Sequence, residues 1–173
     1  MVKGAEVEWG PCSRTVPLDT PTRTLSYWDN IIAVGSQDGS IITHDATTGT
    51  KKAVLSGHEG EVNCVIFSSD GRSLASGADD KTVKLWDIQT GGAVRTFYGH
   101  TELVWSVSIS PDYTRIVSGS RDNTVCLWDI GTGECLSTIE QQTALMYVSF
   151  SPMDYQHIVS ISEDKVWKWN LNG

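Results

Sequence analysis

A period of 42 residues runs through the chain and constrains its fold more than any other feature. The landmarks that keep this spacing are Gly57-His58 with Gly99-His100, Trp86-Asp87 with Trp128-Asp129, and residues 80–83 with 122–125. Extended in both directions, the period divides the chain into copies at 15–56, 57–98, 99–140 and 141–173, preceded by an N-terminal segment, 1–14. A repeated unit of this size buries its faces against its neighbours, so we expect an array of four stacked units.

Each copy is predicted to form four short strands. In the second copy, segments rich in β-branched and aromatic residues occupy 61–68, 73–77, 83–88 and 93–98. Clusters of Asp, Gly and other polar residues separate them and favour tight hairpin turns. No segment keeps a helical period, so the fold class is predicted to be all-β, with four-stranded antiparallel units.

These motifs resemble the WD40 repeat family over residues 15–173. The resemblance implies a small, half or partial β-propeller of four four-stranded antiparallel blades, whereas members of the family usually have seven. The turns at 90–92 and 132–134, Thr-Gly-Gly and Thr-Gly-Glu, also resemble those in the WD40 arrays that follow NACHT-type nucleotide-binding modules in fungal proteins.

Histidine, serine and aspartate recur together in both central copies, and these are the residue types of a catalytic triad. Recurrence in successive blades favours a structural role, because an active site needs to be assembled only once. The family resemblance implies that each set forms a hydrogen-bonded tetrad with the Trp-Asp tryptophan. The predicted tetrads are His58, Ser76, Asp80 and Trp86, and His100, Ser118, Asp122 and Trp128.

The terminal copies depart from this pattern. The fourth copy keeps Ser160, Asp164 and Trp169 but is expected to have Gln142 in place of the histidine. It also stops just after its third strand. By resemblance to the way the family closes its propellers, residues 9–14, which align with the outer strand of the second copy, are a hypothetical fourth strand for the last blade.

The resemblance also implies a partner-binding rim at one mouth of the propeller channel. Counting from the Gly-His and turn-aspartate positions, the rim residues are Glu61, Asn63 and Asp79 in the second copy, Leu103, Trp105 and Arg121 in the third, and Leu145, Tyr147 and Glu163 in the fourth. Trp, Tyr and Arg are enriched at interaction hot spots, so Trp105, Arg121 and Tyr147 form the predicted patch. The alternative is that Trp105 and Tyr147 pack between blades.

Charge and composition exclude several classes of partner. The net charge of −8, from 13 basic and 21 acidic residues, argues against nucleic acid, and no apolar run approaches the length of a membrane helix. We therefore expect a cytoplasmic location, with the nucleus as the alternative. The four histidines lack metal-ligand spacing, and motifs for nucleotide or other cofactors are absent, so neither a metal nor a cofactor is predicted.

The function that these features favour is a non-catalytic scaffold that binds peptides or protein partners. The alternatives are a ligand-sensing array of a larger NACHT-type protein and, least favoured, a propeller enzyme using Glu61, Asp79 and Glu163. Four blades could close alone, could expose apolar blade faces that aggregate, or could pair with a second copy into an eight-bladed homodimeric ring.

Overall fold

The computed structural model describes residues 18, 20–143, 145–151, 156–162 and 165–171. Blade 1 consists of β1 (Thr22–Trp28), β2 (Ile31–Ser36), β3 (Ile41–Asp45) and β4 (Lys51–Leu55). Blade 2 consists of β5 (Val62–Phe67), β6 (Ser73–Ala78), β7 (Val83–Asp87) and β8 (Ala93–Phe97). Blade 3 consists of β9 (Val104–Ile109), β10 (Arg115–Ser120), β11 (Thr124–Asp129) and β12 (Cys135–Glu140). Blade 4 consists of β13 (Leu145–Phe150), β14 (His157–Ser162) and β15 (Val166–Asn170).

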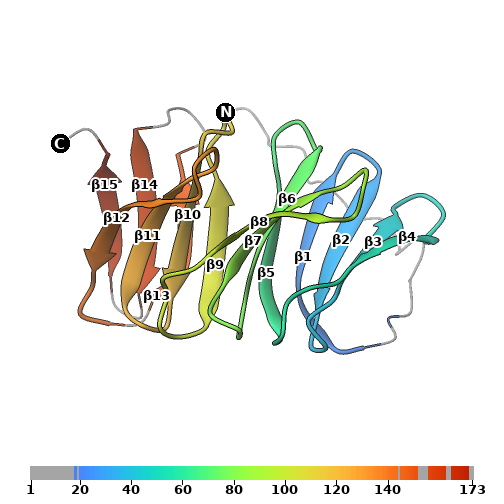
Figure 1. The fold of residues 1–173 in the computed structure, drawn as a ribbon, viewed down its shortest axis with the longest axis horizontal. Coiled ribbons are helices and arrows are strands. Elements are labelled where there is room, and N and C mark those ends of the chain that lie inside the picture. The colour runs from blue at the N-terminus through green and yellow to red at the C-terminus, as the bar shows by residue number, and fades with distance from the viewer. Residues whose placement is uncertain (1–17, 19, 144, 152–155, 163–164, 172–173) are drawn as a thin grey trace, which may run out of the picture.

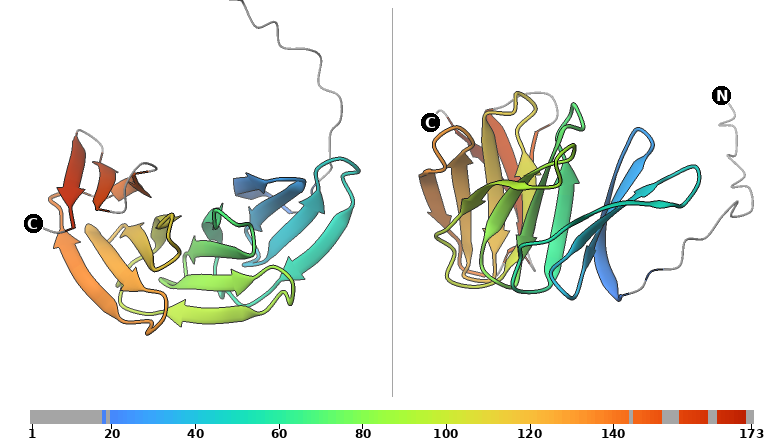
Figure 2. Two further views of the ribbon diagram at one scale, coloured as in Figure 1. Left: turned by 90° about the horizontal axis from the view of Figure 1, so that it is seen from above. Right: turned by 45° about the vertical axis from the view of Figure 1, so that its right-hand side comes forward.

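Each blade is an antiparallel meander whose strands pair in chain order, and the described residues give blade 4 three strands (Figure 1). The prediction of an all-β fold built from antiparallel blades is therefore confirmed. Viewed from above, the blades fan along an open arc, with β1, β5, β9 and β13 on its concave side and β4, β8 and β12 on its outer side (Figure 2). The architecture is that of a partial propeller. In the described ranges, no helix reaches the length and hydrophobicity needed to cross a membrane.

The turn between the second and third strands of each central blade explains the repeated Asp-x-Thr sequence. Asp80 Oδ1 accepts a hydrogen bond from the backbone N–H of Thr82 at 3.0 Å, and Asp122 Oδ1 accepts one from Thr124 at 2.9 Å. The aspartate thereby closes a tight turn around Lys81, whose φ is 67°. This turn leaves the second carboxylate oxygen of Asp80 free to bond elsewhere.

The hydrophobic core lies between blades, in three clusters that each join two consecutive blades. Between blades 1 and 2, residues Ala33, Ile41 and Leu55 pack on Val62, Val65, Phe67, Leu74 and Trp86. Corresponding clusters join blade 2 to blade 3 and blade 3 to blade 4. Each blade therefore presents one face to the blade before it and one to the blade after it. The described residues place no blade against the first face of blade 1 or the last face of blade 4.

A glycine in the second strand allows consecutive blades to approach closely. A Cβ added at Gly77 would overlap Val104 of the next blade, and one added at Gly35 would lie 2.7 Å from Val62 Cγ1. A side chain at this position would therefore push the next blade away. Blade 4 has Ile161 at the corresponding position, so its last face is not built for the same spacing.

Candidate functional site

The structure brings together the four predicted tetrad residues of blade 2. The Trp86 Nε1–H donates to Ser76 Oγ at 2.8 Å, and Ser76 Oγ lies 2.7 Å from His58 Nε2. His58 Nδ1 lies 2.8 Å from Asp80 Oδ2. Because the carboxylate only accepts, Nδ1 carries the proton, and the serine hydroxyl donates to Nε2. The chain of bonds links the segment before β5 to β6, to the turn after β6 and to β7.

Blade 3 repeats the same network with nearly the same lengths. Trp128 Nε1 donates to Ser118 Oγ at 2.7 Å, Ser118 Oγ lies 2.7 Å from His100 Nε2, and His100 Nδ1 lies 2.9 Å from Asp122 Oδ2. The glycine before each histidine packs closely on the indole, since a Cβ would lie 3.3 Å from the Trp86 ring at Gly57 and 3.0 Å from the Trp128 ring at Gly99. The glycine and histidine of the Gly-His motif and the tryptophan of the Trp-Asp motif thus pack together in one unit.

The charge states follow from burial and hydrogen bonding. Burial lowers the pKa of His100 more than the neighbouring Asp122 carboxylate raises it, so the imidazole is neutral at neutral pH. Burial opposes ionisation of Asp80, but hydrogen bonds from His58, Thr82 and the backbone of Glu59 outweigh it and hold the pKa of Asp80 well below its usual range. Burial also opposes ionisation of Asp122, but hydrogen bonds from Thr124, the backbone of Thr101 and His100 outweigh it and lower the pKa of Asp122. The network of blade 3 therefore combines a neutral His100 with an ionised Asp122.

These networks have the connectivity of a Ser-His-Asp triad but not its accessibility. Ser76 and Ser118 are each 0% exposed, and each hydroxyl oxygen already accepts a bond from an indole. A nucleophile must reach its substrate. The geometry therefore assigns both sets to structural hydrogen bonding between strands.

Blade 4 retains part of the network. Gln141 Nε2 donates to Ser160 Oγ at 2.6 Å, and Trp169 Nε1 donates to the same oxygen at 2.9 Å. The glutamine that stands in for the histidine is therefore Gln141, and the expectation of Gln142 was wrong by one residue. Asp164 lies outside the described residues. Blade 1 has His44 at the tryptophan position, where its Nδ1 lies 3.4 Å from the carbonyl oxygen of Gly49.

A groove crosses the concave side of the arc and is the candidate partner-binding site. Its volume is about 350 Å³. We call it the concave groove, and its lining residues are Thr24, Leu25, Ser26, Asn63, Cys64, Val65, Ile66, Trp105, Ser106, Val107 and Tyr147. They come from β1, β5, β9 and β13, the four strands on the concave side (Figure 2). Three predicted rim residues, Asn63, Trp105 and Tyr147, therefore line a single groove.

The predicted rim residues differ in accessibility. Tyr147 is 51% exposed, Trp105 and Leu103 are partly buried, and Asp79 and Arg121 are exposed. Glu61 is paired with Arg23, its Oε1 lying 2.8 Å from the Arg23 Nε. Glu163 lies outside the described residues.

Leu145 was wrongly placed on the rim. It is 0% exposed and belongs to the core cluster between blades 3 and 4. Val62, Val104 and Leu145 occupy equivalent core positions, and the last step between them is 41 residues instead of 42. The residue that follows Val62 is Asn63, and the residue that follows Leu145 is Met146, which is 62% exposed. Met146 therefore takes the rim position of Asn63 and Trp105, which the sequence prediction gave to Tyr147.

Asn63 has an unpaired acceptor in the groove wall. Its Nδ2 donates to Asp79 Oδ1 at 2.8 Å and to the backbone oxygen of Val104 at 3.2 Å. Both partners are acceptors, which fixes the orientation of the amide. Asn63 is only 9% exposed, and among the described residues its Oδ1 has no hydrogen-bond partner.

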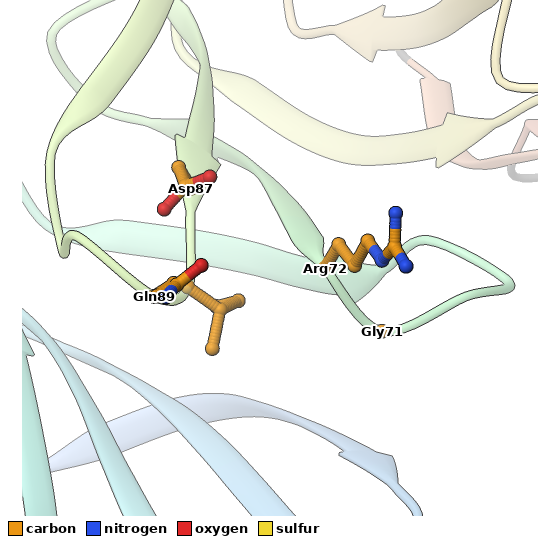
Figure 3. A pocket seen from close by; sticks show the side chains of 5 residues that line it. Gly71, Arg72, Asp87 and Gln89 are labelled. Atoms are coloured by element: carbon orange, nitrogen blue, oxygen red, sulfur yellow. The ribbon is translucent and has the colours of Figure 1, made fainter.

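A second hollow lies between turns of blade 2 and has a volume of about 510 Å³ (Figure 3). Gly71, Arg72, Asp87, Ile88 and Gln89 line it. The Arg72 side chain is 87% exposed, and Asp87 Oδ1 already accepts a bond from the backbone of Thr90. The polar groups that line this hollow therefore do not converge on a common point. The described residues contain no cluster of three or more potential metal ligands.

Comparison with known proteins agrees with this fold. The family model "WD domain, G-beta repeat" (WD40) matches residues 49–87 and 91–129. The chain is similar to the crystal structure of the computationally designed Ika4 protein, with a TM-score of 0.81 and 29% identity over 94% of this chain and 99% of that one. No curated protein matches the chain. The fold is that of a β-propeller, and the chain carries WD40 repeats in its central part.

Proposed function

We propose that this chain is a non-catalytic platform that binds an extended peptide of a protein partner in the concave groove. WD40 repeats generally support protein interaction, and the groove joins all four blades in one surface. The observation that carries the proposal is the pair of aromatic side chains in the groove, Trp105 and Tyr147. Aromatic residues supply large contact areas at low cost in side-chain entropy, and they dominate binding energy at interfaces.

The absence of catalysis is part of the proposal. The two sets of residues that resemble a triad are closed off by burial and by the indole bond to each serine. What the platform offers a partner is a rigid surface, because the strands that line it belong to blades packed through continuous cores. A rigid surface loses little conformational freedom on binding.

A fluorescence polarisation titration with a fully randomised pool of fluorescein-labelled hexapeptides tests the groove. We expect Tyr147→Ala to weaken binding of the pool and to leave the melting temperature unchanged, because half of this side chain is exposed. Trp105→Ala should weaken binding further. Tyr98→Ala is the matched control, since Tyr98 is 74% exposed and does not line the groove.

The same variants separate binding from packing. If Trp105→Ala and Tyr147→Ala lower the melting temperature and leave pool binding intact, then both side chains serve inter-blade packing. Failure of the unmodified protein to bind the pool would exclude the groove as a peptide site.

We also propose that two copies of the chain pair through the ends of their arcs into an eight-bladed ring. The specific observation is on blade 1, where Leu25 and Tyr27 are 67% and 63% exposed. Strand pairing gives them the positions of Val65 and Phe67 in blade 2, which are core residues. Blade 1 thus presents an inter-blade face to solvent.

The other end of the arc would supply the complementary face. Val159 and Val166 of blade 4 correspond to the core residues Val117 and Val125 of blade 3. Ile161 replaces the glycine of the internal interfaces, so a junction between two copies would be wider than the junctions within one chain.

A further inference from the structure

The unpaired oxygen of Asn63 points to the kind of group that the concave groove accepts. A buried carbonyl oxygen without a donor costs roughly 1–3 kcal/mol, so a ligand that brings an N–H to this point removes that cost. Asn63 is held in place by two bonds from its own Nδ2, to Asp79 and to Val104. The acceptor is therefore already oriented before any ligand arrives.

The charges beside Asn63 select among possible donors. The Asp79 carboxylate, which accepts from Asn63, is exposed, while the carboxylate of Glu61 on the same blade is paired with Arg23. An anionic ligand group would meet both the Asn63 oxygen and the Asp79 carboxylate, which repel it. A cationic donor is attracted by both, and the acidic net charge of −8 adds to the attraction at a distance.

The neighbouring strand β9 favours the same choice. Trp105 lines the groove together with Asn63, and it occupies on β9 the position that Asn63 occupies on β5. An indole face attracts a guanidinium or an ammonium group, and indole is the best of the aromatic side chains for this. The exposed Arg121 on blade 3 holds the position of Asp79 on blade 2, so the positive charge of a ligand is directed toward blade 2.

We propose that the concave groove receives an arginine or lysine side chain of the partner peptide, which donates to Asn63 Oδ1 and Asp79 and lies against Trp105. This inference rests on the proposed peptide-binding function and specifies the chemistry of its ligand. Tyr147, on β13, is the groove's aromatic contact for the flanking part of the peptide.

The test uses five pools of labelled hexapeptides that differ only in a fixed third residue: arginine, lysine, citrulline, glutamine or glutamate. Citrulline keeps the shape and the N–H groups of arginine and removes the charge. We expect the arginine and lysine pools to bind about tenfold more tightly than the citrulline and glutamine pools, because charge-assisted bonds are stronger than neutral ones. The glutamate pool should bind most weakly. The preference should shrink as NaCl is raised, because salt screens the attraction.

Two variants attribute the preference to the groove. Asp79→Asn keeps an acceptor for Asn63 Nδ2 and removes the charge, so the arginine pool should fall to the level of the citrulline pool. Glu134→Gln changes the net charge equally on an exposed turn between β11 and β12, outside the groove, and should leave the preference intact. Asn63→Leu should reduce binding of the arginine pool, with the melting temperature checking that the variant folds.

The outcomes separate this inference from the function on which it rests. Binding of all five pools with equal affinity, or tightest binding of the glutamate or citrulline pool, would overturn the basic ligand and leave the peptide platform standing. An unchanged preference for arginine in Asp79→Asn would also overturn it. If no pool binds, both proposals fail together.

Discussion

Blades 2 and 3 differ from blades 1 and 4 in how completely their polar groups are paired, although all four are built on the same pattern of strands. In the central blades, histidine, serine, aspartate and tryptophan form one continuous network. Blade 4 keeps a glutamine, a serine and a tryptophan, and blade 1 has His44 where the tryptophan would be. The meander therefore does not depend on the tetrad.

The comparison shows what the tetrad adds to a blade that can form without it. Trp86 and Trp128 are fully buried, whereas Trp169 is partly exposed beside the exposed Trp167. His44 is 8% exposed, and its Nε2 has no hydrogen-bond partner within the described part of the chain. A complete network thus allows a large side chain and several polar groups to be buried together. We expect the central blades to be the most stable part of the chain and the terminal blades to open first.

The largest expected effect comes from removing a tryptophan. Trp86→Ala should lower the free energy of unfolding by about 3–5 kcal/mol, because it leaves a cavity between blades 1 and 2 and removes the donor to Ser76. Trp169→Ala should cost less, since that side chain is partly exposed. Urea unfolding followed by circular dichroism measures both. Equal losses in the two variants would show that the tetrad adds no stability to the central blades.

A smaller effect is expected from the aspartates. Asp80→Ala and Asp122→Ala should each lower the free energy of unfolding by about 1–3 kcal/mol, because each removes the charged carboxylate acceptor of a buried histidine Nδ1–H. Each also removes the bonds that close the following turn. The melting temperature, measured by differential scanning calorimetry, is the readout. Glu134→Ala is the surface control. If the aspartate variants change the melting temperature as little as this control does, the structural role of the two aspartates is contradicted.

Much of this fold was predictable because the sequence repeats. The central strands fall close to the segments rich in β-branched and aromatic residues, and β5 covers Val62–Phe67 within the predicted 61–68. The tetrad residues were identified by their motif positions, and the structure brings them together in both central blades. Two copies at one spacing provide an internal check that a single motif lacks.

Errors arose where the period slips. Gln141 lies 41 residues after His100, and Leu145 lies 41 after Val104, whereas Ser160 lies 42 after Ser118. The slips fall in connections between strands, where a residue can be gained or lost without disturbing a sheet. Because the prediction kept a fixed period across these slips, it assigned Gln142 to the histidine position, which Gln141 holds. It also assigned the core residue Leu145 to the rim. The unpaired oxygen of Asn63 could not be predicted, because it depends on which acceptors surround the amide.

The smallest effect on stability is expected at the open end of blade 1, where the proposed pairing of two copies can be tested. Leu25→Ser combined with Tyr27→Ser should change the free energy of unfolding of the monomer by no more than about 0.5 kcal/mol, since both side chains are mostly exposed. The same double variant should abolish dimerisation, because it replaces apolar surface that a second copy would bury. Leu136→Ser is the control, as Leu136 is 49% exposed on the outer strand β12.

Light scattering on a size-exclusion column, over a range of protein concentrations, distinguishes the possible results. A dimer for the unmodified chain and for Leu136→Ser, and a monomer for the double variant, is the expected set. A monomer for the unmodified chain at every concentration would show that the exposed face of blade 1 does not bind a second copy. A dimer that survives the double variant would place the contact elsewhere. The exposed face of blade 1 would then not be the dimer interface. The tetrads hold a blade together internally, whereas residues such as Leu25 decide only what it packs against.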